Sequence, residues 1–306
     1  MYLRRNGWLM DKRQVNGHTS LYAVIGSPVK HSKSPAIYNA AFSQDQVNSV
    51  YLAFEADEDA TPTTIAALKQ LGVKGINVTM PGKDVALGSV DELDAAAEYV
   101  QAINCLVQQD EAGGKWKGYN TDGIGFWASV KKATTRSLVK QSVLIFGSGN
   151  TARIILAQAV LEGVTNITVV ARGIDHRPLA IIELASKLAS SHAVKIQVID
   201  LASTLTVQAA LTTSDIVVQA TSLGMAPLTN QSILPEGVVF KSGALACDIV
   251  YNPAETQFLK AAQLQGCQTL GGIHMLVEQA AVNYQLFTGK ELDEEVMLDL
   301  LNQTQD

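Results

Sequence analysis

The sequence predicts an α/β protein built of two domains. Short apolar runs that end at Gly or Pro alternate with helical patterns from end to end, which is typical of a mostly parallel sheet with helices on both faces. The length of 306 residues suits about two domains, because a domain usually spans roughly 100–200 residues. Hydrophobic residues make up 47% of the chain, which indicates a globular protein with a sizeable core.

The N-terminal part carries several strand patterns bounded by turn-forming residues. Leu21 to Ile25 is an apolar run that stops at a Gly-Ser-Pro turn. Ser34 is expected to cap the next helix, with Pro35 at its first helical position. A Gly-Gly turn at 113–114 joins two further strands as a hairpin. We predict strands over 21–25, 51–54, 75–79, 103–107 and 115–119, and helices over 35–41, 61–71 and from Pro81 onward.

From residue 141 the pattern becomes a regular repeat of βα units. The apolar strand 143–146 is followed by a Gly-rich turn and an apolar helix that runs through Leu161. Strands that alternate with helices in this way imply a mostly parallel sheet. We predict further strands over 166–171, 194–199, 216–220 and 244–250, and helices over 181–188, 256–265, 275–287 and 292–301.

Charge and composition exclude several classes of protein. With 23 Lys+Arg and 29 Asp+Glu the net charge is −6, whereas nucleic-acid binders usually show a basic face. The three cysteines form no CxxC pair and the five histidines show no ligand spacing, so we expect no metal site. The chain has no run of 18 apolar residues and no signal-peptide pattern. We therefore expect a cytoplasmic protein that binds neither nucleic acid nor membrane.

A glycine-rich loop at 147–152 follows the strand 143–146 and opens the next helix. This is the GxGxxA variant of the dinucleotide fingerprint: the first Gly permits a tight turn, the second lets backbone approach a pyrophosphate, and the small Ala allows close strand–helix packing. The amides at the helix N-terminus then face the phosphates. The expected cofactor contacts in this loop are Gly147, Ser148, Gly149, Asn150, Thr151 and Ala152.

The residues after the strand 166–171 bear on which cofactor is used. Arg172 is placed to contact the 2′-phosphate of NADP, whereas Asp175 could reach a ribose diol, as the acidic residue of NAD sites does. The alternative interpretation is a solvated loop of mixed charge. We expect NADP and leave NAD open.

Polar residues at other junctions are candidates for a second part of the site. Lys83 lies beyond the strand 75–79, where it suits an acid–base role or a solvated surface position. Asp122, at a predicted strand-to-helix junction, is most simply a helix N-cap. Ser32 and Ser34 offer two hydroxyls that suit a carboxylate or hydroxyl groups, although Ser34 also suits capping.

Eight short motifs occur in one order along nearly the whole chain. They are HSKSP (31–35), NVTMPxK (77–83), AIN (102–104), YNTDG (119–123), GSGNTA (147–152), TSLGM (221–225), DIVYNP (248–253) and GGxxMLxxQAA (271–281). In this order they resemble the shikimate dehydrogenase family, including its quinate/shikimate branch. The resemblance implies an enzyme that interconverts 3-dehydroshikimate and shikimate, with a hydride passing to or from NADP or NAD.

The resemblance also implies a role for each matching residue. Lys83 would exchange the proton at the reacting oxygen, while Asp122 orients it or shares the hydrogen bond. The implied substrate contacts are Ser32, Ser34, Thr79, Asn104, Tyr251 and Gln279. The implied cofactor contacts outside the glycine-rich loop are Arg172, Ile249 and Gly272.

The implied architecture is discontinuous. A substrate-binding domain of residues 1–121 would regain residues 273–306, and a Rossmann-like nucleotide domain would span 122–272, with the substrate in the cleft between them. The protein would be a monomer or a homodimer.

The chain departs from the family pattern at several positions. It has Gly82 where a bulkier residue is common, Asn150 and Thr151 where Gly and Ala are common, and His274 where Gly is frequent. Two alternatives are kept: an enzyme that acts mainly on quinate, and a non-catalytic relative that senses the same metabolites. The presence of both Lys83 and Asp122 argues against the second.

Overall fold

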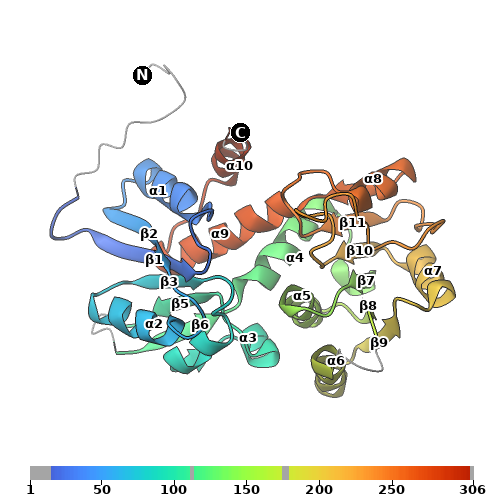
Figure 1. Cartoon of the computed structure of the whole chain (residues 1–306), viewed down its shortest axis with the longest axis horizontal. Coiled ribbons are helices and arrows are strands. Elements are labelled where there is room, and N and C mark those ends of the chain that lie inside the picture. Colours follow the sequence, from blue (N-terminus) through green and yellow to red (C-terminus); the bar gives the residue numbers. More distant parts are fainter. Residues whose placement is uncertain (1–14, 111–113, 174–178, 304–306) are drawn as a thin grey trace.

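The computed structural model describes residues 15–110, 114–173 and 179–303. Two six-stranded sheets form the two lobes of the molecule. The helices α4 (Thr121–Ala133) and α9 (Gly272–Thr288) pack against each other between the lobes (Figure 1). The predicted α/β class is confirmed. Within the described residues, no helix combines the length and apolar content needed to cross a bilayer.

The first sheet is mixed. Its strands are β1 (Ser20–Gly26), β2 (Ser49–Glu55), β3 (Gly75–Val78), β4 (Glu92–Leu93), β5 (Cys105–Gln108) and β6 (Trp116–Tyr119). They lie in the order β2-β1-β3-β5-β6-β4. β1 is parallel to β2 and β3, whereas β5 is antiparallel to β3 and β6. The pairing of β5 with β6 confirms the predicted hairpin.

The second sheet is entirely parallel. Its strands are β7 (Ser142–Phe146), β8 (Asn166–Ala171), β9 (Lys195–Asp200), β10 (Ile216–Gln219), β11 (Leu245–Asp248) and β12 (Gln268–Leu270). They lie in the order β12-β11-β10-β7-β8-β9, so the chain reverses direction across the sheet between β7 and β10. At such a switch point the loops after the two strands diverge and leave a crevice for a ligand.

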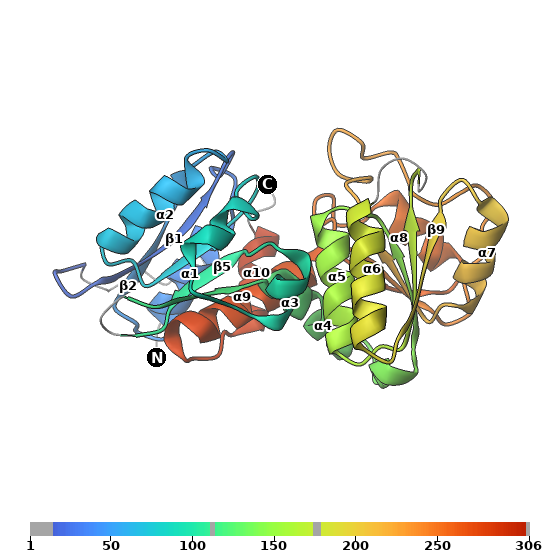
Figure 2. The ribbon, with the colours of Figure 1, turned by 90° about the horizontal axis from the view of Figure 1, so that it is seen from below.

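Helices cover both faces of the second sheet (Figure 2). They are α5 (Asn150–Leu161), α6 (Leu179–Ser191), α7 (Thr204–Thr213) and α8 (Gln257–Leu264). On β7, Val143 and Ile145 pack in the same core as α5 and α6, whereas Leu144 and Phe146 pack with α7 and α8. Neighbouring residues of a strand point to opposite faces, so one apolar run supplies both cores.

The first sheet is covered by helices from both ends of the chain. They are α1 (Ser34–Gln44), α2 (Thr61–Gln70), α3 (Ala95–Val100) and α10 (Glu294–Gln303), together with α9. Tyr22 and Val24 of β1 pack with α1, α9 and α10, whereas Ala23 and Ile25 pack with α2. The last two helices therefore share a hydrophobic core with the first strand.

Two predicted helix starts are wrong. Lys33 holds the N-cap position of α1 and Ser34 is already helical. The amide of Ser34 donates to Oγ of Ser32 at 3.3 Å, so Ser32 supplies the hydroxyl at this helix start. Beyond Pro81 the chain forms a turn and then the 3-10 helix η1 (Val85–Ser89). Gly82 and Gly88 both disfavour a regular α-helix in this segment.

The sequence patterns did not predict β4, α3, α7 or β12. β4 and β12 span only two and three residues, too few for a periodic pattern. In α7 only Val207 and Leu211 are buried, and several of its other residues are threonines, which lack a helical preference. These elements form because the rest of the lobe packs against them.

Candidate active site

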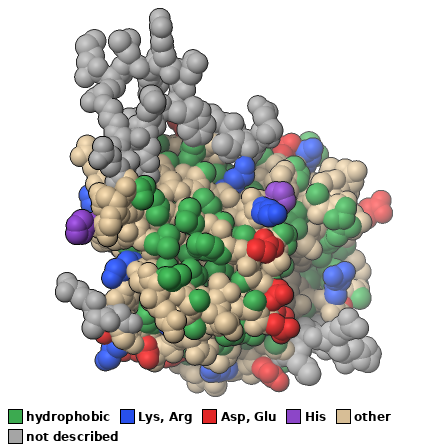
Figure 3. Space-filling model, turned by 60° about the vertical axis from the view of Figure 1, so that its left-hand side comes forward, with side chains coloured by type: hydrophobic (Ala, Val, Ile, Leu, Met, Phe, Trp, Pro, Cys, Tyr) green, Lys and Arg blue, Asp and Glu red, His purple; other side chains and the backbone are tan. Residues whose placement is uncertain are grey.

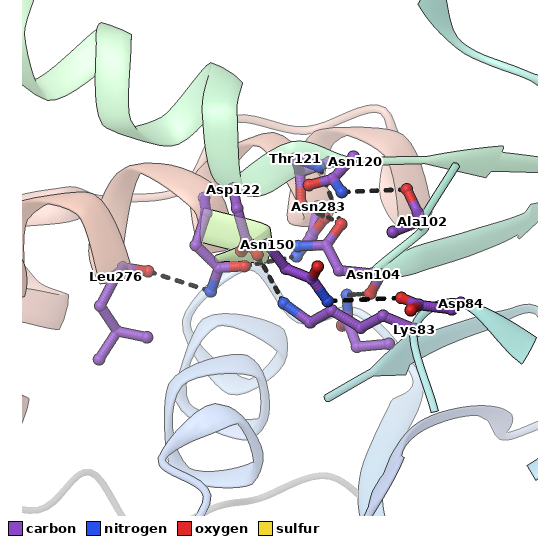
Figure 4. A network of polar contacts seen from close by, with 12 residues as sticks. Lys83, Asp84, Ala102, Asn104, Asn120, Thr121, Asp122, Asn150, Leu276 and Asn283 are labelled. Atoms are coloured by element: carbon purple, nitrogen blue, oxygen red, sulfur yellow. Dashed lines mark hydrogen bonds and ion pairs between the residues drawn. The ribbon is translucent and has the colours of Figure 1, made fainter. Parts of the chain in front are cut away.

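Lys83 and Asp122, which are 39 residues apart in the sequence, form an ion pair with 2.6 Å between Nζ and Oδ2 (Figure 4). Lys83 lies in the turn after β3, and Asp122 lies in the first turn of α4. Their side chains are 19% and 17% exposed. The pair is therefore open to a small molecule, yet less screened by water than a pair on the surface would be.

Asn104 fixes the second carboxylate oxygen of Asp122. Its Nδ2 donates to Oδ1 of Asp122 at 2.8 Å, and its own Oδ1 accepts the amide of Thr121 at 2.8 Å. Asn104 is 4% exposed, so its amide group is held from both ends inside the protein. The prediction that Asp122 is an N-cap is wrong, since Asn120 holds that position. The carboxylate of Asp122 instead faces Lys83 and Asn104.

A chain of buried polar contacts runs from Asn104 toward the start of α1. Nδ2 of Asn77 donates to the carbonyl of Asn104 at 3.1 Å, and the hydroxyl of Tyr51 donates to Oδ1 of Asn77 at 2.7 Å. Burial raises the pKa of Tyr51 well above its ordinary value, and the side chain of Ser34 acts in the opposite direction. Ser34 therefore lies next to the same network as the Lys83–Asp122 pair.

The other predicted substrate contacts lie on separate segments of the chain. Ser32 precedes α1 and accepts the amide of Ser34. Thr79 directly follows β3 and is partly buried. Gln279 lies on α9, where its Nε2 donates to the carbonyl of Leu276 at 3.2 Å. Tyr251 follows β11 and is 42% exposed.

The glycine-rich loop makes a tight turn between β7 and α5. Gly147 has φ of +130°, and a Cβ there would lie 2.7 Å from the carbonyl oxygen of Ala220, which follows β10. Gly149 is the N-cap of α5, and a Cβ there would meet nothing within 4 Å. Ala152 is fully buried. The loop therefore leaves open space in front of a helix N-terminus, at the switch point of the sheet.

The remaining predicted cofactor contacts follow β8 and β11 or lie at the start of α9. The amide of Gly147 donates to the carbonyl of Val170 at 2.9 Å, which holds the start of the loop beside the end of β8. Arg172 is exposed and directly follows β8. A Cβ at Gly272 would lie 2.2 Å from the carbonyl oxygen of Ile249, so only Gly allows the start of α9 to approach β11 this closely. Asp175 lies outside the described residues.

Sequence reasoning missed a buried carboxylate behind these loops. Asp248, the last residue of β11, is 2% exposed. Its Oδ2 accepts from Oγ1 of Thr256 at 2.6 Å, and its Oδ1 accepts from the amide of Val250 at 2.9 Å and from Nε2 of Gln219 at 3.2 Å. These donors are all neutral, and burial raises the pKa of Asp248 from 3.8 to about 6. The contacts join the loops after β10 and β11.

We expect the stability of the protein to fall as pH rises through the titration of Asp248. Between about pH 4 and about pH 6 the folded protein keeps a proton on this carboxyl that the unfolded chain has lost. The free energy of unfolding should therefore drop across this range, by on the order of 2–3 kcal/mol for this group. In Asp248→Asn this contribution should vanish, as measured by urea unfolding at a series of pH values.

Glu236 is exposed, so Glu236→Gln is the matched control for this measurement. Its free energy of unfolding should depend on pH as steeply as that of the parent protein. An Asp248→Asn variant whose stability declines with pH as steeply as the parent would contradict the assignment.

Models of known families match both ends of the chain. The model described as shikimate dehydrogenase substrate binding domain matches residues 24–106. The model described as shikimate 5'-dehydrogenase C-terminal domain matches residues 272–301.

Curated relatives and solved structures cover almost the whole chain. A protein of Lactococcus lactis subsp. cremoris named shikimate dehydrogenase (NADP(+)) is 38% identical over 284 residues, which are 91% of this chain and 95% of that protein. A protein of Streptococcus suis with the same name is 35% identical over 95% of this chain and 99% of its own length. The crystal structure of shikimate 5-dehydrogenase from Listeria monocytogenes in complex with shikimate and NAD has a TM-score of 0.89, with 32% identity over 94% of this chain and 98% of that one. The chain belongs to the shikimate dehydrogenase family.

Proposed function

We propose that this protein is a shikimate dehydrogenase that interconverts 3-dehydroshikimate and shikimate with NADP(H) or NAD(H). The observation that carries the proposal is the Lys83–Asp122 ion pair, partly exposed and held by Asn104. A lysine ammonium fixed by a carboxylate suits the reduction of a carbonyl, because the developing alkoxide needs both a proton and a stabilising charge. The names of the relatives from L. lactis and S. suis support the same activity.

The two lobes suggest a division between substrate binding and nucleotide binding. We propose a substrate-binding domain of residues 1–121 that regains 273–306, and a nucleotide domain of residues 122–272. The packing of α9 and α10 on β1 supports the return of the C-terminus to the first domain. Because Asp122 lies at the start of α4, between the two sheets, movement of one lobe against the other would change the position of the acid–base pair.

The polar residues near the pair suit a ring that carries a carboxylate and hydroxyls. We assign Ser32 and Ser34 to the carboxylate, since hydroxyls donate hydrogen bonds to an anion. Amides both donate and accept, so they can serve hydroxyl groups of either orientation. The proposed contacts to the ring are Thr79, Asn104 and Gln279, with Tyr251 near the carboxylate.

In the direction of reduction, Lys83 donates a proton to the oxygen that becomes the alcohol. Its ammonium also stabilises negative charge on that oxygen before the proton moves. Asp122 keeps Nζ of Lys83 in place, and Asn104 keeps the carboxylate of Asp122 from turning. In the direction of oxidation, Lys83 accepts the proton from the alcohol. A nicotinamide cofactor, when bound, supplies or accepts the hydride.

The cofactor would be held by the edge of the second sheet. The residues proposed for the pyrophosphate are Gly147, Ser148, Gly149, Asn150, Thr151 and Ala152, whose backbone lies at the start of α5. Ile249 and Gly272 would line the nicotinamide end, and Arg172 would meet the 2′-phosphate of NADP. Asp175 is proposed as the ribose contact when NAD is used.

We expect Arg172→Ala to weaken NADP selectively. A guanidinium–phosphate contact is a charged hydrogen bond, so its loss should raise KM for NADP roughly tenfold to hundredfold and change KM for NAD little. Steady-state kinetics with both cofactors measure the difference. Arg136→Ala, at another exposed arginine, is the control. An equal rise in KM for the two cofactors would remove Arg172 from the 2′-phosphate site.

One assay tests the proposed function. Absorbance of the reduced nicotinamide is followed with shikimate and then with quinate, each with NADP and with NAD. We expect turnover with shikimate, fastest with NADP. Faster turnover with quinate would favour the quinate alternative, and saturable binding without any turnover would favour the metabolite-sensing relative.

The edge of the first sheet and the cysteines bear on assembly and compartment. β2 is an edge strand on which Leu52 is 47% exposed, and apolar side chains gather on this end of the molecule (Figure 3). A second copy could cover such an edge, so we propose a homodimer or a monomer, which light scattering distinguishes. The three free, buried cysteines suit a reducing compartment such as the cytoplasm.

A further inference from the structure

Asn283, in the middle of α9, is fully buried and uses its whole amide group in hydrogen bonds. Its exposed fraction is 0%. Its Oδ1 accepts from Oγ1 of Thr121 at 2.8 Å. Its Nδ2 donates to the hydroxyl of Tyr38 at 3.1 Å and to Oε1 of Gln279 at 3.2 Å. A buried amide with every group paired has one orientation, because any other leaves a polar atom unsatisfied.

The hydrogen bonds form a directed chain that sets this orientation. Nε2 of Gln279 donates to the carbonyl of Leu276, which leaves Oε1 of Gln279 as an acceptor. That oxygen accepts from Nδ2 of Asn283, while Oδ1 of Asn283 accepts from Oγ1 of Thr121. The chain thus links α9 to the first turn of α4.

The link ends on the acid–base pair. Thr121 directly precedes Asp122, and its amide donates to Oδ1 of Asn104, which in turn donates from Nδ2 to Asp122. Near this point the two helices touch through their backbones, since a Cβ at Gly125 would lie 2.5 Å from the backbone nitrogen of Gln279. Little side-chain volume separates α4 from α9 here. The close packing at Gly125 and the hydrogen bonds of Asn283 therefore both hold the two helices in their relative position.

We propose that Asn283 is a positioning residue that aligns Asp122 with Gln279. The proposal rests on the function proposed above, in which Asp122 holds the proton donor and Gln279 contacts the ring. Asn283 itself is too deeply buried to touch the substrate or the cofactor. In this role Asn283 sets the distance between the carboxylate of Asp122, which holds Lys83, and the side chain of Gln279, which contacts the substrate.

The test replaces Asn283 by Leu, which has a similar size and forms no hydrogen bond. We expect kcat/KM for shikimate to fall about tenfold to hundredfold, with both a lower kcat and a higher KM. KM for the cofactor should change less than about twofold, because the nucleotide loop lies on the other sheet. Ser129→Ala is the matched control: Ser129 is a buried polar residue of α4 whose hydroxyl donates within its own helix, to the carbonyl of Phe126.

A second pair of variants covers the case in which Asn283→Leu does not fold. Thr121→Val removes the hydroxyl, which lies 2.8 Å from Oδ1 of Asn283 and 3.1 Å from Oδ1 of Asn104, and it keeps the backbone amide that donates to Asn104. We expect this variant to lose kcat/KM for shikimate. Thr121→Ser keeps the hydroxyl and should retain most of the parent value. Rescue by Ser and loss with Val support the proposal.

Three results would overturn the proposal. They are kinetics of folded Asn283→Leu within about twofold of the parent, an equal rise in both KM values, and an equal loss in Ser129→Ala. Where Asn283→Leu does not fold, equal activity of Thr121→Val and Thr121→Ser would overturn it as well. A parent protein that turns over neither shikimate nor quinate would contradict the proposed function instead, so the two failures are distinguishable.

Discussion

Lys83→Ala should lower kcat for shikimate oxidation by roughly 10²–10⁴-fold, the usual contribution of a general acid or base. The variant loses both the proton and the positive charge at the reacting oxygen. KM for shikimate should change much less, because other polar residues also hold the ring. Steady-state kinetics with saturating NADP, together with a binding isotherm for shikimate, separate the two effects.

The control for this variant is Lys74→Ala. Lys74 is exposed and immediately precedes β3, whereas Lys83 follows the same strand. It should leave kcat unchanged. A kcat of Lys83→Ala within about tenfold of the parent would remove Lys83 from the proton-transfer step.

Asp122→Asn should lower kcat by roughly 10²–10³-fold, since it keeps the shape of the side chain and removes its charge. In the parent protein this carboxylate holds Nζ of Lys83 at 2.6 Å and accepts from Asn104 at 2.8 Å. An amide can satisfy Asn104 but attracts the ammonium far less, so Lys83 loses its fixed position. Kinetics with shikimate and the unfolding free energy should both be measured.

Asp215→Asn is a closely matched control for this second prediction. Asp215 forms an ion pair with Lys241 at the same distance, 2.6 Å, and is 15% exposed. It lies in the second lobe, just before β10. We expect it to change stability and leave kcat as it is. If both variants lose kcat equally, the loss reflects damage to the fold rather than the chemistry at Asp122.

The secondary structure of the second lobe was largely predictable. The strand 166–171 has the predicted bounds, and the strand at 143–146 begins only one residue earlier. These strands are buried on both faces, so they appear as continuous apolar runs. Prediction failed where the local signal was ambiguous. A Pro can open an α-helix or a turn, and at Pro81 the glycines that follow decide for the turn.

The candidate site was only partly predictable. The glycine-rich loop carries its own local evidence, because Gly147 and Ala152 lie where the structure leaves no room for a larger side chain. Lys83 and Asp122 were candidates through the motifs around them, but residue type alone suggested an N-cap for Asp122. Asn283 and Asp248 were missed, because the sequence around a single polar residue in an apolar stretch does not indicate which residue its side chain will bond.

Local patterns thus identify most of the strands, most of the helices and the nucleotide loop, because these depend on neighbours a few residues away. Packing over long distances in the chain decides the rest. Thr121 and Asn283 meet although 162 residues separate them, and Lys83 reaches Asp122 because the turn after β3 lies beside the first turn of α4. The physical reason is that a buried hydrogen bond or ion pair depends on where two elements are placed by their apolar faces. Those faces constrain the packing of whole helices, and only the folded chain shows which polar groups then come within reach.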